Sequence, residues 1–434
     1  MRTRPWLPWL MWGIGALCYL MALFHRMSLS VAGLTAQQRF GIDATGLAAF
    51  SVVQFALYAL LQVPVGVGND RLGPRKLLLG GMTLMAAGSV VLALATGYPA
   101  AMTGRALIGA GDACMFVSVL RIAQNWFPGN RYAFVAALTG MIGGLGQLVA
   151  TAPLAALLQA RGWTGAFLVA GAATVVLLVA AAAGLREAPR TEAGEATDVP
   201  SDGPREPLGE SVRLAWRNRG TRHALFTHFT LMGSFVTFTA VLGQPYLVGA
   251  HRLSEGTAGA LLAVVVVGFV VSSTAAGQLA SRRPAARGGL VLAAVLLALG
   301  CSALLVALPA AAPAWVLAVV LAAIGVGGGV SMLAFDLARS ANPGHRAGVA
   351  SGLANMGGFT FAVVAQLGAG VLLDALLAAG VRDENAHRLA FGVPLALAVA
   401  GVIGVVRLRA HAGTPPAESS AREGGRSPGA LTRV

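Results

Sequence analysis

The sequence has few charged residues for its length. Of 434 residues, 11% are Asp, Glu, Lys or Arg, whereas 56% are hydrophobic. One soluble core could not bury so much apolar surface, so a wholly soluble globular protein is excluded and lipid must surround much of the chain. Cysteine is also scarce. The three cysteines lie inside apolar runs without CxxC spacing, which argues against disulfides and metal ligation.

Sequence motifs for catalysis and cofactor binding are missing as well. The chain has no Walker loop, no cofactor fingerprint and no nucleophile-and-base set, so we expect neither an enzyme nor a bound cofactor. The net charge of +14 and the pI near 11.2 would suit a nucleic-acid-binding protein. However, the arginines form short clusters between apolar runs, which is typical of membrane proteins. No nucleic-acid partner is therefore expected.

Twelve apolar runs are present, and each is long enough for the roughly 20 residues that a bilayer-spanning helix needs. They fall into two sets of six, so we predict an all-α membrane protein with twelve transmembrane helices in two six-helix pseudo-repeats. The predicted spans are residues 6–34, 43–66, 76–96, 99–122, 131–158 and 163–185, then 221–250, 256–279, 287–309, 313–338, 345–377 and 387–408.

This pattern divides the chain into four parts. We expect an N-terminal six-helix bundle over 1–185, a charged cytoplasmic linker over 186–220, a C-terminal six-helix bundle over 221–410 and a disordered cytoplasmic tail over 411–434. The linker is expected to end in a short basic surface helix around Val212 to Arg219.

Most basic residues fall in loops on the same side as both termini. This asymmetry predicts cytoplasmic termini in a bacterial-type inner (plasma) membrane. Five arginines fall on the opposite side: Arg39, Arg161, Arg252, Arg382 and Arg388.

An internal repeat relates the two halves. The segment IGAG at 108–111 matches IGVG at 324–327, and PGNR at 128–131 matches PGHR at 343–346. Both offsets are close to half the chain, which indicates a duplicated six-helix unit. Parallel repeats of this kind are typical of transporters whose substrate site lies between the halves.

The loop after the second predicted span reads GVGNDRLGPRK over residues 66–76. Its glycines allow a tight turn with close helix approach, and Asp70 can pair with basic groups or cap a helix N-terminus. The spacing resembles the signature loop of the major facilitator superfamily. The resemblance implies a transporter in which this loop latches the two halves together in one state of the cycle. The residues that carry the match are Gly66, Asp70, Arg71, Gly73, Arg75 and Lys76.

The corresponding loop in the second half reads GQLASRRP over residues 277–284. Ser281 stands where the family often has an acid, so a weaker latch is expected there.

The first span contains FHRMSLS over residues 24–30. Arg26 is an ionisable group inside an apolar helix, and such groups usually face a watery cavity or a partner; snorkelling to the headgroups is the alternative. The segment resembles the D-R-x-x-x-S stretch of anion:cation symporters, a branch that moves organic anions with protons. His25 stands in the acid's position, which leaves the family's proton-coupling assignment there open.

The fourth span carries Arg105, in the place of the superfamily's fourth-span arginine, and Asp112. Seven residues place both on one helix face about 10 Å apart, where they could share a cavity with Arg26. In the symporters that this segment resembles, an acid at this spacing serves proton coupling. The resemblance therefore implies a proton-coupling role for Asp112. It implies the same role for His25, which stands in the acid's position and leaves that assignment open. The alternative is a buried structural acid bonded to neighbouring helices.

Polar residues recur at four-residue spacing in the second span, at Gln54, Tyr58 and Gln62. Such stripes suit a cavity wall and interhelical hydrogen bonding equally well. The second half has no charged group where Arg105 and Asp112 stand in the first, so the ion chemistry is predicted to lie mainly in the first half. The predicted substrate-binding set is Arg26, Arg105, Gln54, Tyr58, Gln147, Gln244 and Asn355.

The leading hypothesis is a monomeric secondary active transporter in the lipid bilayer that takes up a small organic anion with protons. The fifth span has Gly140-x-x-x-Gly144 but lacks the Gly-Pro pair typical of drug and proton antiporters, which favours uptake over efflux. One alternative is a proton-driven exporter of drugs or metabolites. Another is a non-transporting membrane sensor with the same fold.

Overall fold

The structure, a computed structural model, describes the chain almost entirely as helices. No strand occurs among the residues described, and the expected all-α class is confirmed. The described residues are 5–127, 131–187, 206–309 and 312–409, without the side chains of residues 30, 34, 44, 45, 48, 147–152 and 241. The tail expected over 411–434 and most of the linker expected over 186–220 therefore lie outside the described residues.

The helices of the first half follow the apolar runs. Prolines stand in the first turn of several of them, where the N–H that proline lacks has no partner within the helix. The helices are α1 (Leu7–Val31), α2 (Gly33–Phe40), α3 (Ala44–Arg71), α4 (Pro74–Leu94), α5 (Tyr98–Ala113), α6 (Met115–Trp126) and α7 (Arg131–Gly184).

The second half is preceded by α8 (Leu208–Arg217), the basic surface helix. It begins a few residues earlier than the sequence suggests. The helices that follow are α9 (Arg219–Val236), a π-helical turn (Thr237–Leu242), α10 (Gly243–Gly249), α11 (Glu255–Arg282), α12 (Arg287–Ala307), α13 (Ala314–Val330), α14 (Leu333–Ser340), α15 (Ala347–Ala378), α16 (Asp383–Ala390) and α17 (Gly392–Arg409).

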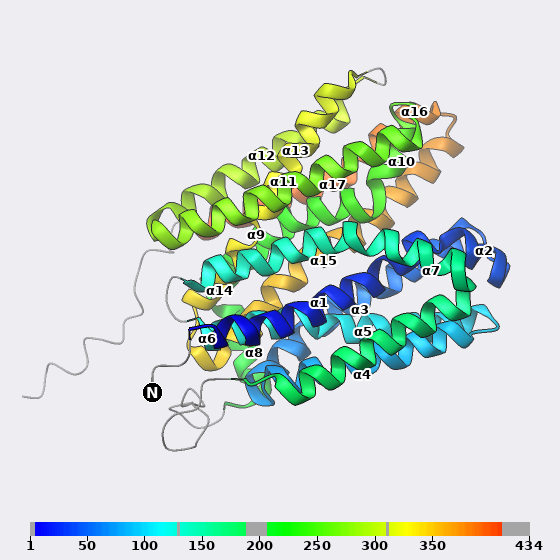
Figure 1. Cartoon of the computed structure of the whole chain (residues 1–434). Coiled ribbons are helices and arrows are strands. Elements are labelled where there is room, and N and C mark those ends of the chain that lie inside the picture. Colours follow the sequence, from blue (N-terminus) through cyan, green and yellow to red (C-terminus); the bar gives the residue numbers. More distant parts are fainter. Residues whose placement is uncertain (1–4, 128–130, 188–205, 310–311, 410–434) are drawn as a thin grey trace, which may run out of the picture.

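Within the described residues, ten helical segments are long and apolar enough to cross a membrane, or up to eleven when the bent segment of α9 and α10 is included. Gly162, with φ of 62°, reverses the direction of α7 and divides it into two arms, as Figure 1 shows. The arm before Gly162 completes the set expected for the twelve-helix fold. Each crossing runs opposite to the one before it. The start of the first crossing and the end of the last one therefore lie on the same side of the bundle, which is called the linker side below.

Both copies of the repeat break at corresponding points. α5 and α6 are separated at Cys114, and α13 and α14 at Ser331 and Met332. A glycine-rich stretch precedes each break, and glycine weakens a helix because it loses more backbone freedom on folding than other residues. At the first break the backbone tightens, since the N–H of Cys114 donates to the oxygen of Gly111 at 3.1 Å. The break lies two residues after Asp112.

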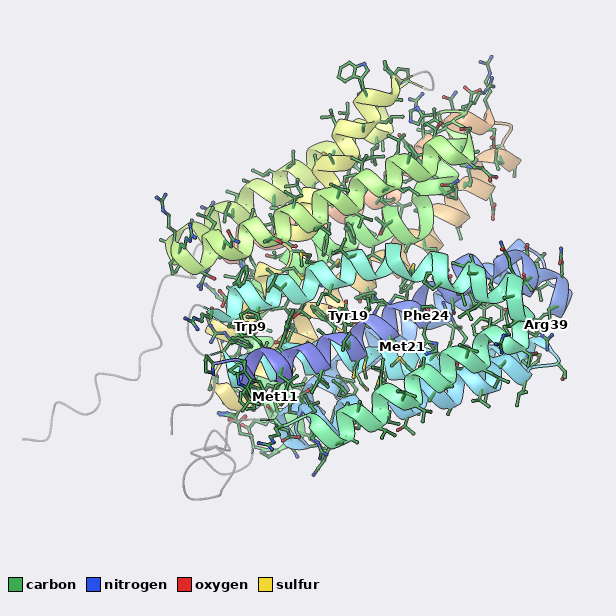
Figure 2. The ribbon with its side chains drawn as sticks, viewed as in Figure 1. Trp9, Met11, Tyr19, Met21, Phe24 and Arg39 are labelled. Carbon is green, nitrogen blue, oxygen red and sulfur yellow. The ribbon has the colours of Figure 1, made fainter. Side chains whose placement is uncertain are left out.

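Several predicted spans differ from the helices that form. Besides the spans broken at Cys114 and at Ser331 and Met332, the run predicted over 221–250 is divided among α9, the π-helical turn and α10. The run predicted over 6–34 ends early at Val31, and a separate short helix, α2, follows it. The run predicted over 387–408 is divided between α16 and α17. Figure 2 shows α1 crossing the bundle from Trp9 at the linker side to Phe24 near the far side, where Arg39 lies on α2.

Candidate functional site

A small cavity lies between the two halves. Its volume is about 30 Å³, close to the share of one water molecule in the liquid, so this conformation is closed around the site. The walls come from α1, α3, α6 and α7 in the first half and from α9, α11, α15 and the break between α13 and α14 in the second. The lining residues are Tyr19, Arg26, Tyr58, Phe116, Gly140, Gly143, Gly144, Met232, Phe235, Val236, Phe269, Met332, Asn355 and Phe359.

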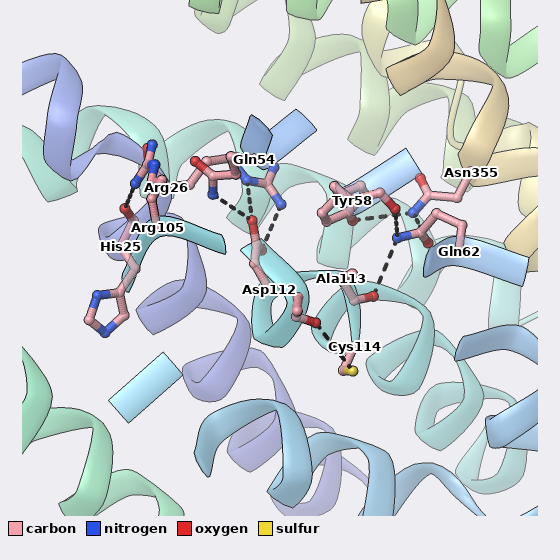
Figure 3. A network of polar contacts seen from close by, with 11 residues as sticks. His25, Arg26, Gln54, Tyr58, Gln62, Arg105, Asp112, Ala113, Cys114 and Asn355 are labelled. Atoms are coloured by element: carbon pink, nitrogen blue, oxygen red, sulfur yellow. Dashed lines mark hydrogen bonds and ion pairs between the residues drawn. The ribbon is translucent and has the colours of Figure 1, made fainter. Parts of the chain in front are cut away.

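A buried ion pair stands at the edge of this cavity. The Nε and Nη2 of Arg26 donate to the two carboxylate oxygens of Asp112, each at 2.8 Å. The exposed fraction of the side chain is 6% for Arg26 and 0% for Asp112, so both charges depend on each other rather than on solvent. Gln54 adds a third hydrogen bond to Asp112 at 3.2 Å, and Figure 3 shows the three side chains together.

The second half helps to hold the Arg26 cation. Its guanidinium carbon lies 4.8 Å from the centre of the Tyr58 ring and 5.5 Å from that of Phe359, and aromatic faces attract cations. The Nδ2 of Asn355 donates to the Tyr58 hydroxyl at 3.2 Å and to Oε1 of Gln62 at 2.7 Å. Because Phe359 and Asn355 belong to α15, the charged site of the first half is joined directly to the second.

Arg105 and His25 are buried beside this site but face other groups. Arg105 donates to the backbone oxygens of His25 and Arg26 at 2.9 and 3.0 Å, so it holds the backbone of α1. The Nε2 of His25 lies 2.8 Å from the hydroxyl of Thr174 on α7. Neither residue lines the cavity, so the structure does not bring the Arg105 guanidinium and Arg26 together as two free cations.

The remaining predicted binding residues differ in their positions. Gln54 reaches the site only through Asp112. Gln244 lies on α10 with its Nε2 3.5 Å from the backbone oxygen of Glu255, and it does not line the cavity. Gln147 falls on α7, but its side chain lies outside the described residues.

On the linker side, the end of α3 contacts the beginning of α15. The two carboxylate oxygens of Asp70 accept from the backbone N–H groups of Gly348 and Val349 at 2.9 Å each. Arg121 lies 3.5 Å from the same carboxylate. Asp70 therefore both pairs with a cation and caps a helix N-terminus, the two interactions that its position in the motif suggested.

Glycine makes this linker-side contact possible. A Cβ added at Gly66 would lie 2.5 Å from the backbone oxygen of Gly348, closer than real Cβ atoms come. The two helices therefore touch through their backbones, and this contact closes the linker side of the molecule.

The other residues of the motif support this end of α3. Gly73 has a φ of 86°, which favours glycine over other residues, and it sits in the turn between α3 and α4. Arg75 donates to the backbone oxygen of Ala182 at 2.6 Å, and Lys76 is exposed. Arg71 donates to the backbone oxygen of Glu206 at 2.7 Å.

Glu206, which sequence reasoning did not single out, joins this contact from the segment before α8. Its carboxylate accepts two hydrogen bonds from Arg346 and lies 3.4 Å from the Nε2 of His345. The hydrogen bonds from Arg346 lower the pKa of the Glu206 carboxyl below its ordinary value.

A Glu206→Gln variant should be slightly less stable than the natural chain at neutral pH. The lowered pKa of Glu206 means that its stabilisation is present above about pH 4.3, the ordinary value for Glu, and is lost as the pH falls through the lower, folded-state value. The difference should stay within about 1 kcal/mol because solvent screens the pair. Melting temperatures in detergent from pH 3 to 8 measure it. Glu210→Gln on α8 is the control, and a difference that grows on acidification would contradict the expectation.

A second buried ionic cluster lies on the linker side of the second half. Asp336 on α14 is 2.7 Å from Arg287 and 3.2 Å from Arg339, and the guanidinium of Arg339 lies 4.7 Å from the ring centre of Tyr132 on α7. Ser281, in contrast, only bonds its own helix. Asp336, on another helix, pairs with Arg287, the basic residue that follows the second motif loop. A signal was present in the sequence, since Asp336 stands three residues before Arg339 at the end of a span.

Comparison with known proteins adds the family. Residues 15–366 match the family described as Major Facilitator Superfamily. The chain belongs to this superfamily. Solved superfamily structures agree in fold: the fucose transporter FucP in its outward conformation superposes with a TM-score of 0.65 at 15% identity, covering 90% of this chain and 98% of FucP. A bacterial homologue of the human lysosomal transporter Spinster superposes with a TM-score of 0.58 at 16% identity, covering 94% of this chain and 96% of the homologue.

Curated relatives within the superfamily match over shorter segments. A probable L-galactonate transporter of Escherichia coli is 28% identical over 36% of this chain and 34% of its own length. A hexuronate transporter of Bacillus subtilis is 24% identical over 56% of this chain and 58% of its own. The match thus spans between about a third and somewhat more than half of these proteins. Their names and the family agree with the expectation of a transporter rather than an enzyme.

Proposed function

We propose that this chain is a secondary active transporter that takes up a small organic anion with a proton by alternating access. The observation that carries the proposal is the buried pair of Arg26 and Asp112 at a cavity between the two halves. The fork of a guanidinium binds carboxylates with two parallel hydrogen bonds. A substrate carboxylate is therefore the kind of group that can replace Asp112 on Arg26.

Such an exchange couples the anion to a proton. When the substrate binds Arg26, Asp112 loses its cation partner while it stays buried. A buried carboxylate without a partner is neutralised by binding a proton. The loaded site then holds the Arg26 cation, the substrate anion and a neutral Asp112, so no buried charge is left uncompensated. The hydrogen bond from Gln54 keeps the side chain of Asp112 near the site.

Helix α15 connects the charged site at the cavity to the linker-side contact. Asn355 and Phe359 touch the charged site, and the N-terminus of their helix, α15, is capped by Asp70. Movement of α15 at the cavity is therefore expected to strain or release the contact at Asp70. The two halves rock about the site, and the linker side opens when Asp70 leaves α15.

The proposed location is a bacterial-type inner membrane, with both termini and the linker in the cytoplasm. Basic loops on the linker side support this orientation. In that case the conformation described here is closed to the cytoplasm. We further propose that one chain is sufficient for transport, because both walls of the cavity come from the same chain.

Uptake into proteoliposomes tests the proposal. Radiolabelled organic acids should accumulate when the outside is acidified, and Asp112→Asn should reduce the stimulation by the pH gradient by about tenfold or more, since an amide cannot carry the proton. Asp374→Asn, at an exposed carboxylate on α15, is the matched control and should behave as the natural chain.

Other outcomes separate the alternatives. Uptake that does not depend on the pH gradient, or that is unaltered in Asp112→Asn, would contradict proton coupling through Asp112. Outward movement of drugs would favour an exporter. A folded protein that binds an acid but does not transport it would favour a sensor.

A further inference from the structure

We infer that the anion taken by this site is a hydrophobic, ring-bearing carboxylate and not a polyhydroxylated sugar acid. The inference rests on the proposed function, because it keeps Arg26 as the partner of the carboxylate. It adds the chemistry of the rest of the substrate, which follows from the walls of the cavity.

The wall that the second half contributes offers little hydrogen bonding, whereas Tyr19 and Tyr58 of the first half place hydroxyl-bearing rings beside Arg26. The second half contributes Phe235, Phe269, Phe359, Met232 and Met332 among others, with Asn355 as its polar side chain in the lining. The amide nitrogen of Asn355 already donates twice, to Tyr58 and to Gln62. A substrate hydroxyl would therefore find few free partners on this wall.

The aromatic rings pack in a way that suits a flat or compact apolar ring. Phe235 and Phe269 are stacked with their centres 4.5 Å apart and their planes at 27°. Beside Arg26, the ring centres of Tyr58 and Phe359 lie 4.1 Å apart. Rings gain from offset or edge contacts with further rings, so a cyclic substrate could extend the existing packing.

Where α7 lines the cavity, its residues are glycines. A Cβ at Gly144 would lie 2.8 Å from the Phe269 ring, and one at Gly140 would overlap the sulfur of Met332. These glycines bring the apolar side chains of the second half against α7 without adding a polar side chain of their own.

The site must expand to admit any organic acid, because its present volume is about 30 Å³. Methionine is the side chain best suited to such a change, since it is unbranched and flexible. Met232 and Met332 can thus move apart around a ring. Expansion between apolar side chains still produces an apolar pocket.

A hydroxyl group that leaves water for such a pocket loses hydrogen bonds that it does not regain. Discrimination against a single added hydroxyl in an apolar site can reach about 100-fold. A sugar acid carries several hydroxyls, whereas an apolar ring loses no hydrogen bonds on entry. We therefore expect at least about tenfold preference for the apolar acid.

A matched pair of acids tests this preference. Cyclohexanecarboxylate and quinate share a six-membered ring and a carboxylate, and quinate adds hydroxyls. Cyclohexanecarboxamide keeps the ring without the charge, and it also controls for partitioning into detergent. Binding of each to the purified full chain is measured by isothermal titration calorimetry and by thermal shift.

A wall variant tests the assigned residues. Met232→Gln is nearly isosteric and places an amide at the cavity. It should weaken cyclohexanecarboxylate binding by roughly tenfold and improve quinate binding. Met356→Gln is the matched control, because Met356 is also partly buried but packs beside α8 and Val349. It should leave both affinities unchanged.

Each outcome decides one question. Preference for cyclohexanecarboxylate over both quinate and the carboxamide, with the shift in Met232→Gln, supports the inference. Preference for quinate overturns the inference but leaves the proposed function standing. Equal binding of cyclohexanecarboxylate and its carboxamide overturns the proposed function and the inference with it, whereas no binding of either acid overturns the inference alone.

Discussion

An Arg26→Gln variant is expected to lose at least about 100-fold of the anion uptake of the natural chain. The guanidinium is the partner of the substrate carboxylate, and breaking a buried charge pair costs about 3 to 5 kcal/mol, or more than two factors of ten in affinity. The variant should also be less stable, because Asp112 stays buried without its cation partner and keeps one hydrogen bond, from Gln54. Uptake into proteoliposomes and the melting temperature measure the two effects.

A double variant separates these effects. Arg26→Gln with Asp112→Asn removes both charges, so it should recover most of the lost stability while uptake stays absent. Arg26→Lys keeps the charge without the two-pronged geometry and should transport weakly. If Arg26→Gln were to transport at a rate near that of the natural chain, Arg26 would not be the anion partner.

A Gly352→Ala variant is expected to slow transport by about tenfold or more without unfolding the protein. A Cβ at this position would overlap the backbone oxygen of Gln62 on α3, so α3 and α15 could not close on the linker side. Folding should be retained because alanine favours a helix by about 1 kcal/mol over glycine and separation of α3 from α15 would relieve the clash. Turnover in proteoliposomes measures the loss.

Gly370→Ala provides the matched control on the same helix, since nothing lies within 4 Å of a Cβ there. The state of the linker side can be followed with a cysteine at Ser351, which is buried in this conformation at 6% exposure. Its alkylation should be faster in the Gly352→Ala background than in the Gly370→Ala background. Equal alkylation and equal turnover would show that the close helix crossing does not limit the cycle.

Much of the fold was predictable because a membrane span has a strong signal. Long apolar runs predicted the helices, and glycine and proline marked many of their ends. The breaks at Cys114 and Ser331 were harder to predict, since the hydropathy of the runs continues through them. The separate helix α2 was missed for another reason: it is polar and short, and neither property distinguishes it from a loop.

The site was predictable in part. The motif indicated that Asp70 can pair with basic groups or cap a helix N-terminus, but it could not show which helix Asp70 contacts, because that helix lies far away in the sequence. Spacing placed Arg105 and Asp112 on one face, yet it could not show that Arg105 turns to the carbonyl groups of α1 while Arg26 takes the carboxylate. The pairing of Asp336 with Arg287 joins residues from different helices. No local sequence pattern shows which side chains from different helices will pair.

The pair of Arg26 and Asp112 also bears on the membrane potential. In the empty protein the two charges cancel, so reorientation without substrate carries no net charge across the bilayer at this site. In the proposed loaded state, a monovalent anion and a neutral Asp112 again sum to zero with Arg26. A voltage acts on net charge, at about 2.3 kcal/mol per elementary charge and 100 mV. Uptake of a monovalent acid would then be driven by the proton gradient alone, whereas a divalent acid would move against an inside-negative potential.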